Sequence, residues 1–173
     1  MKKYNIALVF NQEVETQIIG YAKKLYNHIP SKLSLGQNSL PHMTLIQFTA
    51  EESVKKTVWA DFRGLALETP ILTLSGVTIL PSSGGGAWIE ISVLKSDELL
   101  KLQQSIISCL PSIITPDNDT GDKYRPHITI AHLSESRETI AVPVEYKPLR
   151  LNNLESKLAI GVGTNFDPCI EVL

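Results

Sequence analysis

The sequence has few cysteines, little net charge and no long apolar run, and each absence excludes a class of protein. The two cysteines, Cys109 and Cys169, match no metal-ligand or redox spacing. We therefore expect reduced thiols, with a single disulfide as the alternative. The formal net charge of −2 excludes broad binding along a nucleic-acid backbone, which needs a surplus of Lys and Arg, but permits a local basic pocket for one phosphate. No stretch approaches the roughly 18 consecutive apolar residues of a membrane span.

What remains is the composition of an ordinary soluble globular protein. The 173 residues, 43% hydrophobic and 20% charged, predict one domain over 1–173, built as two small lobes around a shared core. The opening "MKKYNIALVF" has an apolar run too short for a signal peptide, and polar residues follow it, so we interpret it as a first strand. Together with reduced cysteines, this favours a cytoplasmic protein.

Hydrophobic periodicity predicts a mixed α/β (α+β) chain with two similar halves. Helical spacing covers 11–29, which Pro30 ends, 51–65, and 96–110, where Ser96 is a candidate N-cap. Strands are expected at 4–10, 42–49, 71–80, 87–94, 127–133, 142–151, 156–164 and 168–173. The triple glycine at 84–86 precedes a strand rather than a helix, so it predicts a hairpin turn and not a phosphate-binding loop.

One short sequence occurs twice. "PHMTL" begins at Pro41 and "PHITI" begins at Pro126, and each opens an expected strand. Shuffling the composition would give Pro-His-x-Thr roughly 0.02 times, so two copies are not an accident. A lone His-x-Thr would most often be an ordinary partly buried polar pair, whereas a matched pair points to a shared function.

Strand geometry places the polar residues of each copy together. Alternate residues of a strand face the same way, so His42 shares a face with Thr44, and His127 shares a face with Thr129. The intervening apolar residues face the other way and are expected to pack against the helices. The polar faces of the two halves then open onto a central cleft.

Two imidazoles across a cleft suit proton-transfer chemistry. Histidine titrates near neutral pH, so one ring can act as a general base while the other acts as a general acid. The hydroxyls of Thr44 and Thr129 can donate hydrogen bonds to the nonbridging oxygens of a phosphodiester, whose charge changes during in-line attack. The sequence has no cluster of acidic ligands, so this chemistry requires no metal or other cofactor. Which histidine is the base stays open.

The doubled motif resembles the two-histidine (2H) phosphoesterase superfamily, in particular its RNA 2′,5′-ligase-like and cyclic phosphodiesterase branch. The resemblance implies two pseudo-symmetric lobes of mostly antiparallel sheet flanked by helices around a central cleft. It also implies that His42 and His127 are the acid–base pair and that Thr44 and Thr129 bind phosphate oxygens. The implied activity is metal-independent opening of a 2′,3′-cyclic phosphate at an RNA end or on a nucleotide, or reversible 2′–5′ RNA ligation.

The second motif departs from the branch at one position. Where RNA-ligase-like relatives often carry Arg, this chain has His132, which by strand parity is expected to face away from His127. The preceding loop, "GDKYRPH", offers substrate contacts: Arg125 for phosphate and Tyr124 for stacking on a base. A solvated loop is the alternative. Trp59 is assigned to packing. For Trp88, which follows the glycine-rich turn, core packing in the hairpin is favoured, with a place in the cleft wall as the alternative.

Two other functions remain open. A noncatalytic module could hold a nucleotide or RNA end in the same cleft, although binding alone does not need two proton-transfer groups. A thiol nucleophile at Cys109 or Cys169 is a further alternative, but neither cysteine lies near a His-x-Thr motif in the sequence. The only partner that the sequence indicates is the substrate, with no membrane and no metal. We expect a monomer because no interface helix is evident.

Overall fold

A computed structural model describes residues 1–26, 31–33, 35–36, 39–65, 67–83, 85–133, 149, 151, 154–163 and 171–172. These residues form three helices, a short 3-10 turn and seven strands. In order they are β1 (Lys2–Phe10), α1 (Gln12–Tyr26), β2 (His42–Ala50), α2 (Glu52–Arg63), β3 (Leu74–Pro81), β4 (Ala87–Val93), α3 (Asp97–Ser108), η1 (Gly121–Lys123), β5 (His127–Leu133), β6 (Ser156–Val162) and β7 (Glu171–Val172).

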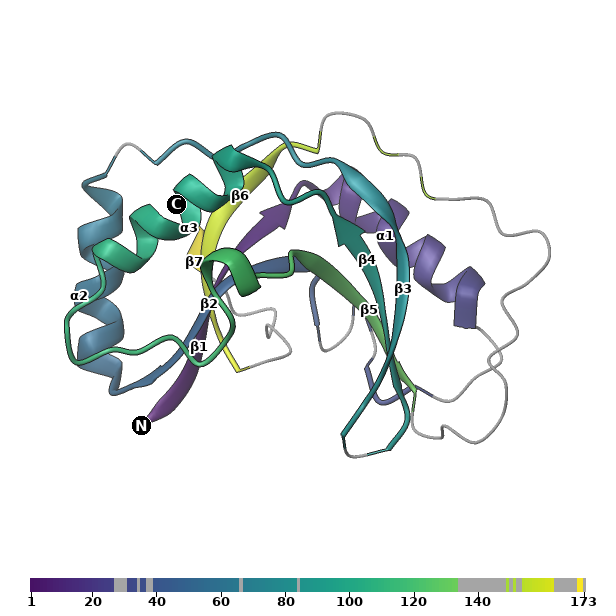
Figure 1. Ribbon diagram of the computed structural model, residues 1–173, viewed down its shortest axis with the longest axis horizontal. Coiled ribbons are helices and arrows are strands. Elements are labelled where there is room, and N and C mark those ends of the chain that lie inside the picture. Colours follow the sequence, from purple (N-terminus) through teal and green to yellow (C-terminus); the bar gives the residue numbers. More distant parts are fainter. Residues whose placement is uncertain are drawn as a thin grey trace.

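All seven strands belong to one antiparallel sheet with the order β3-β4-β5-β2-β1-β6-β7. Helices α2 and α3 lie on one side of the molecule and α1 on the other (Figure 1). The two halves meet at the single pairing of β2 with β5, between Met43 and Ile128. These are equivalent residues of the two motifs, so the sheet has an approximate two-fold relation at this point.

Local sequence explains where two of the helices begin. The side chain of Asn11 accepts a hydrogen bond from the Val14 amide at 3.0 Å, and Ser96 accepts one from the Leu99 amide at 3.2 Å. Such N-caps satisfy backbone donors that have no partner within the helix. The N-cap predicted at Ser96 is therefore confirmed, and α3 starts directly after it.

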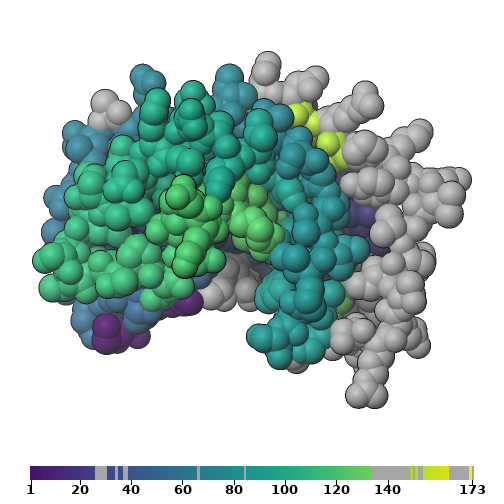
Figure 2. All heavy atoms as spheres, viewed as in Figure 1, coloured from purple at the N-terminus to yellow at the C-terminus, as the bar shows by residue number. Residues whose placement is uncertain are grey.

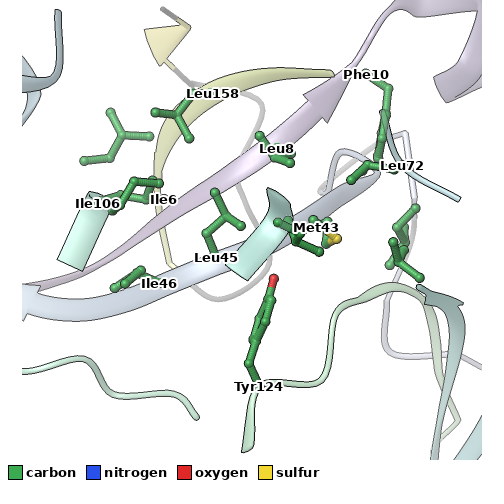
Figure 3. Close-up of a cluster of buried hydrophobic side chains, with 14 of the residues drawn as sticks. Ile6, Leu8, Phe10, Met43, Leu45, Ile46, Leu72, Ile106, Tyr124 and Leu158 are labelled. Carbon is green, nitrogen blue, oxygen red and sulfur yellow. The ribbon is translucent and has the colours of Figure 1, made fainter. Parts of the chain in front are cut away.

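The apolar residues of the two motifs form the centre of the core. Met43, Leu45, Ile128 and Ile130 are fully buried, as strand alternation predicts. They pack with apolar residues of β1 and with Ile106 of α3 (Figure 3). One face of the central strands is therefore anchored in the core, and the opposite face carries the histidines and threonines.

Each motif strand contains a bulge at the same place. Opposite β1, the register skips Leu45, which follows Thr44; opposite β4, it skips Ile130, which follows Thr129. A bulge inserts one extra residue and reverses the facing of every residue beyond it. The burial patterns of the two strands agree over seven residues, with a half-buried residue at the first, third and sixth positions.

The predicted elements are confirmed in most places, with ends that differ by a few residues. The edge strand β3 begins at Leu74 rather than at residue 71, and the hairpin to β4 is present. The strand predicted at 142–151 falls almost entirely outside the described residues, as do Cys169, Pro30 and Gly84. Across the described ranges, no helix has the length and apolar character needed to cross a membrane.

Candidate active site

The polar residues of both motifs line one cavity of about 600 Å³. His42, Thr44, His127 and Thr129 all contribute to its wall, although 85 residues separate the two copies in the sequence. The molecule is hollowed between the β3–β4 hairpin (teal) and the green segment that contains η1 (Figure 2). The structure thus brings together the four predicted catalytic residues, whose roles stay a prediction.

The ring of His42 is held as a neutral imidazole. Its Nδ1 lies 2.7 Å from the carbonyl oxygen of Leu40, which can only accept, so Nδ1 carries the proton. Its Nε2 lies 3.4 Å from the side-chain amide nitrogen of Asn5, a donor that suits a lone pair. Burial lowers the pKa of His42 to about 4, and the charge of His127 lowers it as well, against the Leu40 contact. The ring of His42 is therefore neutral at neutral pH, with its proton on Nδ1 and its lone pair on Nε2.

The ring of His127 has the opposite surroundings. Its Nδ1 lies 2.8 Å from the carbonyl oxygen of Arg125, so this nitrogen also donates. Its Nε2 lies 3.3 Å from a carboxylate oxygen of Glu90. Glu90 is a buried residue, with 4% of its surface exposed. Because ionised carboxylates only accept hydrogen bonds, both ring nitrogens face acceptors. A proton on Nε2 of His127 therefore has an acceptor in Glu90, and the two contacts fix the orientation of the ring.

Hydrogen bonds also orient Thr44 and Glu90. Asn5 donates to the hydroxyl oxygen of Thr44 at 3.0 Å, which leaves the hydroxyl proton of Thr44 to bind another acceptor. Arg125 makes a two-pronged ion pair with Glu90. A bidentate pair of this kind fixes the orientation of the carboxylate beside His127.

The two predicted substrate-contact residues both reach the cavity, but in different ways. Tyr124 is 5% exposed, and its hydroxyl donates to the carbonyl oxygen of Thr44 at 2.6 Å (Figure 3). Little of its ring is left for stacking on a base, so its main contact ties the loop to β2. The side chain of Arg125 is 52% exposed although it pairs with Glu90, so it can still approach a phosphate.

Two expectations from the sequence are wrong, and the bulge in β5 explains the first of them. Strand parity placed His132 on the opposite face from His127, but the extra residue Ile130 returns His132 to the same face. Trp88, opposite His132 on β4, is half-buried and lines the cavity instead of packing in the core. Trp59 does pack in the core, as expected, with 2% exposure and an edge-on contact to Phe62.

Sequence reasoning also missed Asn5 and Glu90, the residues that set the environments of the two histidines. Both were visible as polar residues inside strands that are otherwise apolar, "YNIALVF" and "AWIEISVL". A buried polar group without a partner is costly, so such residues signal an interaction across the sheet. The bulges had a signal too: each His-x-Thr is followed by two consecutive apolar residues, which breaks strict alternation.

No group of three or more His, Cys, Asp or Glu side chains in the described part of the chain could hold a metal ion. Cys109 is a free thiol that directly follows α3 and is not among the cavity-lining residues described. The titratable side chains that line the cavity beside the two motifs are His42, His127 and Glu90, with Asp119, Tyr124 and Arg125 further along its wall.

Comparisons with known proteins agree with this architecture. The sequence model of the 2′-5′ RNA ligase superfamily matches residues 11–153, a range that contains both motifs. No curated protein matches the sequence. E. coli LigT complexed with 3′-AMP superposes with a TM-score of 0.65 at 16% identity, over 99% of this chain and 93% of that chain. A crystal structure described as a phosphoesterase gives 0.60 at 13% identity, with the same coverage.

At these identities the solved structures establish the fold, which is that of E. coli LigT. The superfamily's sequence model covers most of the chain and both of its His-x-Thr motifs. This protein therefore belongs to the 2′-5′ RNA ligase superfamily of two-histidine phosphoesterases.

Proposed function

We propose that this protein is a metal-independent phosphoesterase that hydrolyses a cyclic phosphodiester by paired-histidine acid–base catalysis. The substrate we propose is a 2′,3′-cyclic phosphate at an RNA end or on a nucleotide. The observation that carries the proposal is the opposite hydrogen bonding of His42 and His127 in one cavity. E. coli LigT was solved with 3′-AMP, a nucleotide of the kind that opening such a ring would release.

We assign His42 as the general base. A base needs an unprotonated nitrogen directed at its proton donor, and the lone pair on Nε2 meets that need. In the proposed step, a water oxygen forms a bond to phosphorus while a water proton passes to Nε2 of His42. The low pKa of His42, about 4, keeps this nitrogen available from neutral to mildly acidic pH.

We assign His127 as the general acid. As the water attacks, the bond from phosphorus to one ribose oxygen breaks, and that oxygen takes the proton from Nε2 of His127. Glu90 supports this role because its carboxylate accepts a hydrogen bond from Nε2 and so holds the ring in place. Arg125 balances the charge of Glu90, which would otherwise repel an anionic substrate.

Thr44 and Thr129 hold the nonbridging phosphoryl oxygens in this proposal. They lie one pleat beyond the histidines on the same strand faces, so their hydroxyls flank the position of the phosphorus. Donors fixed before the reaction stabilise charge that develops in the transition state without further reorganisation. We further propose one bilobal unit over 1–173 that works as a monomer in the cytoplasm.

The direct test incubates the protein, with a chelator present, with the four nucleoside 2′,3′-cyclic monophosphates and with a short RNA that ends in a cyclic phosphate. His42→Ala and His127→Ala serve as controls. We expect turnover by the native protein, loss in both variants, and a bell-shaped dependence of rate on pH. A flat pH profile across the histidine range would contradict the paired roles.

Ligation is the second candidate, because the superfamily is named for 2′-5′ RNA ligases. It is the same ring-opening chemistry, with the 5′-hydroxyl of a second RNA in place of water. Adding a second RNA with a free 5′-hydroxyl end to the assay would reveal a joined product. Binding of nucleotides without turnover in either direction would instead support the noncatalytic module.

A further inference from the structure

Two aromatic rings form a stacked pair at one end of the cavity. Trp88 of β4 lies opposite His132 of β5, with ring centroids 3.7 Å apart and an interplanar angle of 9°. Of this pair, Trp88 lines the cavity described above and His132 does not. The indole therefore forms part of the cavity wall, and the imidazole stacked on one of its faces restricts its orientation.

The imidazole behind the indole is itself held in place. Nε2 of His132 lies 3.3 Å from the hydroxyl of Ser82, in the turn between β3 and β4. The backbone of His132 is bonded to Ser31 at 3.2 Å and to Lys32 at 2.8 Å. Burial and the charge of Lys32 both lower the pKa of His132, so the ring is neutral and stacks as an uncharged aromatic.

Apolar residues line the cavity next to Trp88. Leu80, opposite Trp88 on β3, and the adjoining Pro81 belong to its wall, whereas Gln47 and Asn118, which are hydrogen-bonded to each other, line it from β2 and the loop before η1. A flat, weakly polar group suits the wall beside Trp88, because an aromatic face and aliphatic side chains offer stacking and few hydrogen bonds. A nucleobase is such a group, whereas a sugar hydroxyl or a second phosphate is not.

The separation from the threonines also fits a nucleotide. On β4, Trp88 lies two residues from Glu90, which is opposite Thr129. Two residues of a strand span about 7 Å, and they face the same way. Thr129 is one strand further across the sheet, which adds about 5 Å, so the ribose of a nucleotide would bridge the gap between a phosphate at the threonines and a base at the indole.

We propose that the Trp88–His132 pair is the platform on which the base of a nucleotide substrate stacks. The proposal rests on the proposed function for the position of the phosphate. It narrows the substrate class to nucleosides or RNA ends with a cyclic phosphate, and excludes cyclic phosphates that lack a base. Purines should bind more tightly than pyrimidines, because the larger ring covers more of the indole.

Tryptophan fluorescence tests the platform without turnover. The chain has two tryptophans, so Trp59→Phe leaves Trp88 as the sole reporter, and Trp59 is buried away from the cavity lining. We would titrate this variant with adenosine 3′-monophosphate, cytidine 3′-monophosphate, and a ribose 3-phosphate that carries a methoxy group in place of the base. We expect saturable quenching by the two nucleotides, with the purine tighter, and none by the base-free compound.

Affinity should depend on the indole only when a base is present. Stacking of a base on an aromatic residue is worth roughly 5- to 150-fold in affinity. Calorimetry should show this loss for adenosine 3′-monophosphate on Trp88→Leu and a smaller loss on Trp88→Phe. Binding of the base-free phosphate should not change. Ile79→Ala, on the same hairpin and 38% exposed, is the matched control that should behave as the native protein.

The outcomes separate this inference from the proposed function. Equal affinity for the nucleotide and the base-free phosphate would overturn the platform, even if cyclic phosphates are hydrolysed. Base-dependent binding that is lost in Trp88→Leu would support the platform, even if no cyclic phosphate is turned over. No nucleotide binding at all would overturn it. If Trp88→Leu does not fold, the affinity of Trp88→Phe and the fluorescence quenching in Trp59→Phe still show whether the base stacks on Trp88.

Discussion

The two halves of the active site share a backbone and differ in chemistry. β2 against β1 and β5 against β4 have the same register and the same bulge, so each residue of one half has an equivalent in the other. His42 corresponds to His127, and Thr44 to Thr129. On the neighbouring strand, however, Ala7 occupies the position of Glu90. One histidine therefore has a carboxylate beside it, and the other does not.

A second pair of equivalent positions differs as strongly. Gln47 and Asn5 form the cross-strand pair that corresponds to His132 and Trp88. The first half thus ends in two side-chain amides and the second in two stacked aromatic rings. Symmetry of the scaffold supplies two matched proton-transfer groups, and the substitutions on neighbouring strands make them unequal. Unequal groups are what an acid–base mechanism needs, because one must be protonated while the other is not.

The largest effect should come from removing either histidine. His42→Ala and His127→Ala should each lower kcat by about 10²–10⁴-fold, the usual contribution of a general acid or base. Because the two groups act in one step, the double variant should be little worse than the single variants. Steady-state kinetics with a cyclic nucleotide checks both points. Fully additive losses would mean that the histidines act independently.

Glu90→Gln removes the carboxylate that distinguishes the surroundings of His127 from those of His42. A glutamine amide can donate to Nε2 of His127, which favours the neutral ring and removes the acid at high pH. We expect the alkaline side of the kcat/KM profile to move to lower pH, with a loss of about 10-fold or more at pH 8 and a smaller loss at pH 6. A uniform loss at every pH would instead indicate that Glu90 only supports the fold.

Asn5→Asp is the converse change. The low pKa of His42, about 4, predicts that the native rate falls only at pH values well below 6.5 on the acidic side. A carboxylate beside Nε2 should favour protonation of His42 and move this acidic limb upwards by about one pH unit. Gln47→Glu, which adds the same charge elsewhere in the cavity, is the control. If both variants shift the limb equally, the contact of Asn5 with His42 does not matter.

The smallest effect concerns the link between the halves. Tyr124, from the loop before β5, donates its hydroxyl to the backbone of β2. Burial of this hydroxyl, which raises its pKa well above the usual range, agrees with a neutral donor. Tyr124→Phe should lower the free energy of unfolding by about 1 kcal/mol in urea denaturation. A matched change at Tyr4, whose hydroxyl donates to Glu52 outside the site, should leave kcat/KM unaltered.

Local patterns in the sequence determined much of this protein. The repeated Pro-His-x-Thr placed two polar faces on two strands, alternation assigned the intervening residues to the core, and the cap at Ser96 marked the start of α3. Each of these inferences depends on interactions between residues a few positions apart. Spacing within one strand or one helical turn is enough to specify them.

The tertiary structure decided which residues face one another. Asn5 reaches a histidine 37 residues away, and Arg125 reaches a carboxylate 35 residues away. Those contacts follow from the strand order β4-β5-β2-β1, which no local pattern specifies. Strand parity failed at His132 because the bulge at Ile130 reverses the facing of the residues beyond it. The sequence by itself therefore predicted two histidines as the reactive groups, and only the packing of neighbouring strands placed an amide beside one and a carboxylate beside the other.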